Sequence, residues 1–144
     1  MEIRKLCPEE WGAAAALVWQ VFQRFEAPEY PPQGVEAFRS FLEDRQGLLS
    51  LGAWAAWEGE ELIGVLASRR EGSHICLCFV REDFHRQGIG RSLWEHFLAE
   101  TCAKRITVHS SPYAVGFYHR LGFLDTAEEQ QQDGIRFTPM EYTR

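Results

Sequence analysis

The segment from His85 to Arg91 carries the residues whose types and spacing most clearly point to chemistry. It reads His-Arg-Gln-Gly-Ile-Gly-Arg and stands between an apolar run and a helical pattern. Glycines at the mouth of a helix let a ligand approach the backbone closely, and the first-turn N–H groups and the helix dipole favour an anion. Arg86 and Arg91 flank the loop. We therefore expect a phosphate group to bind at Gly88.

The known nucleotide motifs do not account for this loop. A dinucleotide-binding fingerprint would need a third glycine at position 93, where Leu93 stands, and a Walker loop would need Gly-Lys followed by Ser or Thr. An ordinary glycine-rich turn before a helix is the structural alternative. The position of the loop among the predicted elements decides between the two interpretations.

Hydrophobic periodicity predicts the elements that must position the loop. An amphipathic helix is expected from Pro8 to about Phe25, and a second helix from Val35 to about Asp44. Between them, Ala27–Gly34 holds three prolines and is expected to be a stiff, partly polyproline-like loop. Further helices are expected after Gly88 and over 113–121. Strands are expected over 3–6, about 51–57, 62–68, 74–80 and 105–109, with a final strand pair turned at 133–134.

The resulting order is β-α-α-β-β-β-α-β-α-β-β. Adjacent strands with short connections must be antiparallel, whereas a strand-helix-strand unit is parallel. We therefore expect an α/β (α+β) fold with a mixed, mostly antiparallel central sheet and helices on both faces.

A second motif follows in the segment from Ser111 to Phe123, which reads Ser-Pro-Tyr-Ala-Val-Gly-Phe-Tyr-His-Arg-Leu-Gly-Phe. With the first motif and this order of elements, the chain resembles the GNAT (GCN5-related N-acetyltransferase) superfamily from Ile3 to Tyr142. The family patterns are Gln/Arg-x-x-Gly-x-Gly/Ala and Asn-x-x-Ala-x-x-Phe-Tyr-x-x-x-Gly-Phe. His85 and Ser111 depart from them, at the first position of each pattern.

The resemblance implies the GNAT fold and acetyl-CoA as co-substrate. In the family, the glycine loop cradles the pyrophosphate, and a splayed strand pairs with pantetheine and offers N–H groups to the oxyanion. The resemblance also implies that Tyr118 lies near the CoA sulfur and acts as general acid. The alternative is a tyrosine that only anchors its helix in the core. The implied acetyl-CoA contacts are Cys78, Phe79, Val80, Arg86, Gln87, Gly88, Ile89, Gly90, Arg91 and Ser111.

The general base is not fixed by the sequence. The strand over 105–109 contains no glutamate, although many family members place one near the catalytic strands. His74 and His109 each lie at a predicted strand end, and Glu26 and Glu29 lie at the proline-rich loop expected to overhang the acceptor. A water chain is the remaining alternative.

The expected reaction is direct acetyl transfer, in a ternary complex, to a primary amine of a small molecule. A peptide N-terminus or a lysine is the alternative acceptor. Because the usual Asn and Glu are missing, a non-catalytic acyl-CoA-binding sensor or regulatory module is the alternative outside enzymes, and intact Tyr118 argues against it. The Pro-rich loop is expected to shape the acceptor pocket, with Tyr30 lining it.

A metal site is not expected. His74, Cys76 and Cys78 would share one strand face at a two-residue period, but a tetrahedral site needs a fourth ligand and no paired Cys/His motif occurs elsewhere. Core packing accounts for these residues better.

Composition limits the remaining classes. The chain of 144 residues is expected to be a single domain, because 45% apolar residues suffice for one core. A net charge of −6 without a Lys/Arg block is a poor match for nucleic acid or anionic membranes. No signal-type or membrane-spanning stretch is evident, and four cysteines are too few for a disulfide scaffold, so a cytoplasmic location is expected. A homodimer is left open.

Overall fold

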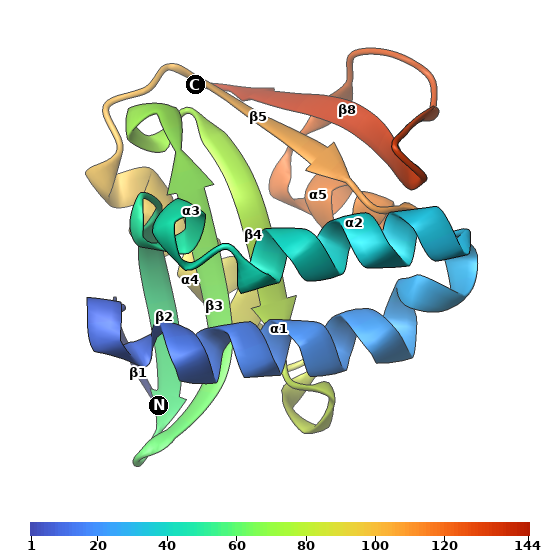
Figure 1. The fold of residues 1–144 in the computed structure, drawn as a ribbon. Helices are drawn as coiled ribbons and strands as arrows, with labels where there is room; N and C mark the ends of the chain where they lie inside the picture. Colours follow the sequence, from blue (N-terminus) through green and yellow to red (C-terminus); the bar gives the residue numbers. More distant parts are fainter.

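The computed structural model describes residues 1–144, apart from the side chain of Arg70, and contains one mixed sheet covered by helices (Figure 1). The strands lie in the order β1-β2-β3-β4-β5-β8-β6, with β7 paired to β8. The elements in chain order are β1 (Glu2–Lys5), α1 (Trp11–Phe25), α2 (Pro32–Glu43), α3 (Arg45–Leu49), β2 (Gly52–Glu58), β3 (Glu61–Arg69), β4 (His74–Val80), α4 (Ile89–Glu100), β5 (Arg105–Ser110), α5 (Val115–Leu121), β6 (Leu124–Asp125), β7 (Gln130–Gln132) and β8 (Ile135–Thr143).

The strand directions confirm the predicted mixed sheet. Strands β1 to β4 form an antiparallel meander, β4 and β5 are parallel, and β5 pairs antiparallel with β8. The parallel pair follows from the crossover through α4, because a parallel connection needs a long link between its strands. The predicted α/β class and element order are therefore confirmed.

The two faces of the sheet carry separate apolar cores. On one face, α1 and α2 cover the sheet, and the fully buried Phe22 of α1 packs with Val65 and Leu77 of the sheet. On the other face, Leu93 of α4 and Leu121 of α5 pack against the sheet. Alternation of side chains along the strands supplies both cores, because successive residues point to opposite faces.

The segment Ala27–Gly34 differs from its prediction. It is not a polyproline-like loop: Ala27–Glu29 form a 3-10 turn, and α2 begins at Pro32. Proline at the first helical position has a suitable φ and lacks only an N–H that would have no partner there, so Pro32 starts the helix instead of preventing it. The short α3 and β6 were not predicted, because each is too short for a periodic pattern.

The final hairpin forms as predicted at Asp133-Gly134. Both residues have positive φ, 53° and 80°, as a two-residue hairpin turn of the primed type requires. Within the described chain, no helix is long and apolar enough to cross a membrane.

The Phe22 side chain should be a main support of the core beneath α1 and α2. It is fully buried and stacks on Phe38 with ring centroids 4.1 Å apart. We expect Phe22→Ala to lower the free energy of unfolding by roughly 3–5 kcal/mol, because it removes apolar contacts and leaves a cavity. Urea unfolding measures this loss. Gln20→Ala, exposed on the same helix, is the control, and equal midpoints for the two variants would contradict the assignment.

Candidate active site

Strand β4 leaves β5 after its first two residues. His74 pairs with Thr107 and Ile75 with Val108, and the described residues show no further β4–β5 pair although β4 continues to Val80. All of β5 pairs with β8 on its other side. The edge of β4 from Leu77 to Phe79 therefore faces a gap in the sheet, and its backbone groups that do not pair with β3 can bind a ligand.

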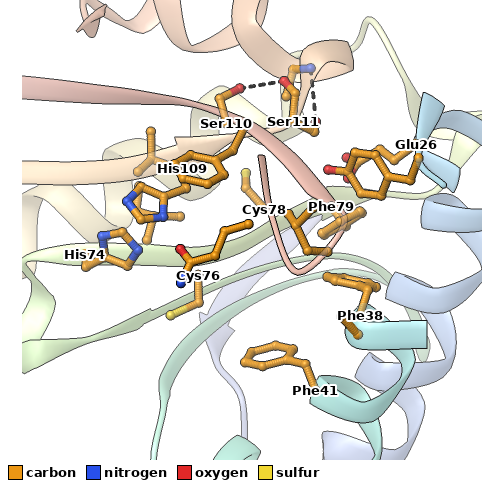
Figure 2. Close-up of a pocket in the computed structure, with 18 of the residues that line it drawn as sticks. Glu26, Phe38, Phe41, His74, Cys76, Cys78, Phe79, His109, Ser110 and Ser111 are labelled. Carbon is orange, nitrogen blue, oxygen red and sulfur yellow. Dashed lines mark hydrogen bonds between the residues drawn. The ribbon is translucent and has the colours of Figure 1, made fainter. Parts of the chain in front are cut away.

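Two cavities meet at this gap. The Gly88 cavity, about 550 Å³, is lined by the end of β4, by residues 84–86 and 88–91 before and within α4, and by α5. The Phe38 cavity, about 370 Å³, is lined by parts of α2, β4, β5 and β8 (Figure 2). A ligand reaching from one to the other would pass the residues that line both, which are Glu26, Cys78, Phe79 and Ala114.

The Gly88 loop has the geometry of an anion site. Gly88 is the N-cap of α4 with φ 78°, and a Cβ built there would meet nothing within 4 Å, so the backbone faces open space. The N–H groups of Ile89, Gly90 and Arg91 have no partner within the helix, and no side chain caps them. These N–H groups and the positive end of the helix dipole lie at the Gly88 cavity, where they can bind an anion.

Three guanidinium groups surround the same cavity. Arg86 and Arg91 come from the loop and α4, as the sequence predicted, and Arg120 comes from the last turn of α5. Arg91 donates a hydrogen bond to the Arg120 carbonyl oxygen at 3.0 Å, which ties α4 to α5. Charged donors beside free backbone N–H groups fit a ligand with several phosphates. These residues therefore fit the CoA moiety that the sequence motifs imply.

Glu26 lies where the two cavities meet, immediately after α1. Burial raises the pKa of this carboxyl group to about 7; a hydrogen bond from the Ser111 side chain opposes the shift, and the charge of Glu29 adds to it. A carboxyl group with this pKa can accept or release a proton near neutral pH. Figure 2 shows Glu26 at the opposite end of the Phe38 cavity from His74.

The other candidates for the base lie elsewhere. Glu29 is exposed and lines neither cavity, and its carboxylate lies 4.0 Å from Arg136. His74 is buried and its Nδ1 lies 2.7 Å from the Thr107 hydroxyl, while His109 stacks on Phe137 at 4.4 Å. Both histidines line the Phe38 cavity. Among the predicted candidates, only the Glu26 side chain reaches both cavities.

Comparison with known proteins identifies the family. A family model described as an acetyltransferase (GNAT) domain matches residues 26–144. This chain belongs to the GNAT acetyltransferase family. No curated protein matches the sequence.

Solved GNAT structures share the fold along nearly the whole chain. A GCN5-related N-acetyltransferase from Rhodopseudomonas palustris superposes with a TM-score of 0.86 at 19% identity, covering 99% of this chain and 95% of that one. PaiA N-acetyltransferase from Thermoplasma acidophilum, in complex with coenzyme A, superposes with a TM-score of 0.76 at 19% sequence identity, over 99% of this chain and 98% of that one. Apo-form YjaB from Escherichia coli superposes with a TM-score of 0.76 at 22% sequence identity, over 98% of this chain and 96% of that one. These identities support the fold alone.

The residues that the GNAT motifs single out lie in three places. Gln87 is exposed outside both cavities, and its amide donates to the Asp83 carbonyl oxygen at 3.4 Å. Ser111 lines the Phe38 cavity and accepts a hydrogen bond from the Ala114 N–H at 3.3 Å. The remaining predicted acetyl-CoA contacts line the Gly88 cavity: Cys78, Phe79, Val80, Arg86, Gly88, Ile89, Gly90 and Arg91. Sequence reasoning missed Arg120, whose only signal is its place two residues after Tyr118.

Tyr118 and Cys78 both remain protonated at neutral pH. Tyr118 lines the Phe38 cavity, and its ring packs edge-on against Phe117 and Phe123. Burial holds the pKa of Tyr118 well above its ordinary value, with smaller contributions from Cys78 and Glu26. Burial and then the charge of Glu26 raise the pKa of Cys78 to about 12. Cys78 is therefore a poor nucleophile, since a thiol reacts as its thiolate.

The predicted common face of His74, Cys76 and Cys78 is wrong. Leu77 pairs with Ala67 and Ile75 with Ser68, so Cys76 is an extra residue in β4. This bulge lets Cys76 pack against the core beneath α1 and α2, whereas Cys78 packs against the opposite core. Among the side chains that the structure describes, no group of three His, Cys, Asp or Glu residues could hold a metal ion.

The raised pKa of Glu26 should make stability depend on pH. The folded state binds the Glu26 proton more tightly than the unfolded chain, so the stability that this group contributes is lost as the pH rises from about 4 towards 7, and Glu26→Gln removes this loss. We expect the variant to gain about 1–3 kcal/mol relative to wild type between pH 4 and pH 8. Urea unfolding at both pH values measures this gain. An equal difference between the two proteins at both pH values would refute the raised pKa.

Proposed function

We propose that this protein transfers an acetyl group from acetyl-CoA to the primary amine of a small molecule, directly in a ternary complex. The observation that carries the proposal is the meeting of the Gly88 and Phe38 cavities at the open edge of β4. One cavity suits a phosphate-bearing donor and the other a largely apolar acceptor. Both substrates can therefore be bound at once, with their reacting ends beside Cys78.

The donor would be held along the Gly88 cavity. The free N–H groups at the start of α4, with Arg86 and Arg91, hold the pyrophosphate, and Arg120 adds a third cation. The open edge of β4 pairs with the amide groups of the pantetheine arm. When bound, acetyl-CoA supplies an activated thioester carbonyl at the junction of the cavities.

Glu26 is the proposed general base. With a pKa of about 7, much of this carboxyl group is ionised at neutral pH and can take a proton from the acceptor ammonium group. The neutral amine then forms the new C–N bond at the carbonyl carbon. Backbone N–H groups at the end of β4 stabilise the negative charge that develops on the carbonyl oxygen, which is usually worth about 3–4 kcal/mol per donor.

Tyr118 is the proposed general acid. It lines the Phe38 cavity, and its raised pKa keeps the phenol protonated until the C–S bond breaks. The phenol then donates its proton to the leaving sulfur. The bound nitrogen loses its second proton as the amide forms, and this proton restores the phenol, while the proton taken up by Glu26 returns to solvent. A sensor that only binds acyl-CoA would need the Gly88 cavity but neither a carboxyl group of raised pKa nor a second cavity, so the site favours an enzyme.

Binding of acetyl-CoA should depend on Gly88. Gly88→Asp places a side chain and a negative charge where the pyrophosphate is expected, and we expect calorimetric titration to show at least about a hundredfold weaker binding. Gly59→Asp is the matched control, since Gly59 also has a positive φ of 60° with nothing within 4 Å, but lies in the exposed β2–β3 turn. Equal affinity of the two variants for acetyl-CoA would show that the pyrophosphate does not bind at Gly88.

Turnover should depend on Glu26 and Tyr118 without a matching loss of donor affinity. Loss of a general acid or base typically lowers kcat by about 10²–10⁴-fold, and we expect such losses for Glu26→Gln and Tyr118→Phe. Glu26→Gln should also remove the rise in kcat/KM near pH 7. Steady-state assays with a primary amine at several pH values measure kcat and the pH dependence of kcat/KM, and calorimetry measures acetyl-CoA affinity.

The controls for these two variants lie nearby but outside the cavities. Glu29→Gln removes an adjacent carboxylate, and Tyr142→Phe removes a hydroxyl from the same aromatic cluster as Tyr118. Both should keep near wild-type kcat. An unchanged kcat of Tyr118→Phe would show that Tyr118 is not the general acid. A wild-type pH profile of kcat/KM in Glu26→Gln would show that Glu26 is not the general base.

A further inference from the structure

Two walls of the Phe38 cavity, α2 and the β7–β8 turn, are in close backbone contact. Gly34, in the first turn of α2, lies against Gly134, in the turn between β7 and β8. A Cβ on Gly34 would overlap the Gly134 carbonyl oxygen, and a Cβ on Gly134 would overlap the Gly34 nitrogen. Figure 1 shows the start of β8 beside the first turn of α2. Two backbones approach this closely only because neither residue has a side chain.

Arg136 provides a second tie between the same walls. Its Nη1 donates to the Glu29 carbonyl oxygen at 3.0 Å, and its Nε donates to the Glu129 carboxylate at 2.9 Å. It therefore joins β8 to the turn that precedes α2. We call this tie and the contact of Gly34 with Gly134 the clasp.

We propose that the clasp closes one side of the acceptor cavity and so selects a small monoamine with an apolar, aromatic-sized body, in place of a peptide or protein. This inference rests on the proposed acetyl transfer and names its acceptor class. Tyr30 and Phe38 line the cavity from one side of the clasp, and Ile135 and Phe137 line it from the other. Because the two sides meet at the clasp, an extended chain cannot leave the cavity through that point.

The size of the cavity agrees with a small acceptor. Its volume of about 370 Å³ lies near the lower end of the range for small-molecule sites, about 300–1,000 Å³. It runs along β4 from Cys78 to His74, which is about 13 Å at the rise of a strand. An extended peptide advances about 3.3–3.6 Å per residue, so about four residues would already fill this length. A peptide would therefore need an opening at the far end.

The lining favours an apolar body. Phe38 and Phe41 of α2, Phe79 of β4 and Phe137 of β8 present rings to the cavity, and Figure 2 shows Phe38, Phe41 and Phe79 along one side of it. Aromatic side chains bind flat apolar groups by offset or edge-on packing. An acceptor with an aryl group would replace water along these rings, which stabilises binding.

The charges of the lining favour one amine per acceptor. Glu26 lies at the reacting end, where the ammonium group must be deprotonated. At the other end, the exposed Arg69 lines the cavity, and its position in β3 pairs with His74 of β4. The remaining carboxylate of the described lining is that of Asp133, an exposed residue of the β7–β8 turn. A second ammonium group at the end away from Glu26 would meet the Arg69 cation, and the described lining offers it no buried carboxylate there.

The substrate panel tests the acceptor class with wild-type protein. The probes are 2-phenylethylamine, putrescine, a hexapeptide with a free N-terminus and no lysine, and a hexapeptide with a blocked N-terminus and one lysine. We expect kcat/KM for 2-phenylethylamine to exceed that of each other probe by about a hundredfold. A peptide or putrescine acetylated as well as 2-phenylethylamine overturns this inference and leaves the proposed function standing. No transfer to any of the four amines, despite acetyl-CoA binding, overturns the proposed function and this inference with it.

The Gly34→Ala variant tests the clasp. Its methyl group must push the β7–β8 turn away from α2, so we expect KM for 2-phenylethylamine to rise about tenfold while acetyl-CoA affinity stays within about twofold. Gly12→Ala, in the exposed face of α1 with nothing within 4 Å, is the matched control and should match wild type. Arg136→Ala removes the second tie without adding bulk and should raise KM in the same direction. If the Gly34→Ala protein melts cooperatively and its KM is unchanged, the proposed role of the clasp is wrong. If that variant does not fold, an unchanged KM of the Arg136→Ala protein shows the same.

Discussion

The separation of β4 from β5 is the constraint on which the rest of the site depends. The two parallel strands pair only at the start of β4, and β5 then remains paired with β8 alone. The extra residue at Cys76 comes directly after the last paired position, where a bulge bends and twists a strand. Because the strands part there, α4 and α5 can enclose one cavity beyond the gap while α2 and β8 enclose the other. A continuously paired sheet would leave no shared opening.

Burial at this gap also sets the protonation states. The same loss of water that raises the pKa of Glu26 to about 7 raises that of Cys78 to about 12 and holds that of Tyr118 high. Burial disfavours the charged form of each group, so the same environment brings the pKa of the carboxyl group near neutral pH and keeps the phenol protonated, as the proposed base and acid roles require. The shift of Glu26 lowers stability at neutral pH, a cost that the two cores must offset.

Local signals in the sequence predicted the donor side better than the acceptor side. The loop at Gly88 could be recognised because its N-cap, its free N–H groups and its arginines are close together in the chain. The strands followed from two-residue alternation. The bulge at Cys76 could not be predicted, since one inserted residue reverses the face of those after it without changing composition. Glu26 could be named only as one of several candidate bases, because its pKa depends on burial by residues from distant parts of the chain.

The contact between Gly34 and Gly134 explains why the walls of the Phe38 cavity could be predicted only in part, through Tyr30. It joins segments far apart in sequence, and each glycine alone resembles an ordinary helix or turn residue. The Gly88 cavity is built within residues 78–121, apart from Val21 and Glu26, whereas the Phe38 cavity needs α2 and β8 to meet. The Phe38 cavity can therefore be reshaped through α2 and the β7–β8 turn while the Gly88 loop keeps its geometry. Changes at Glu26, Cys78, Phe79 or Ala114 cannot be confined in this way, because these residues line both cavities.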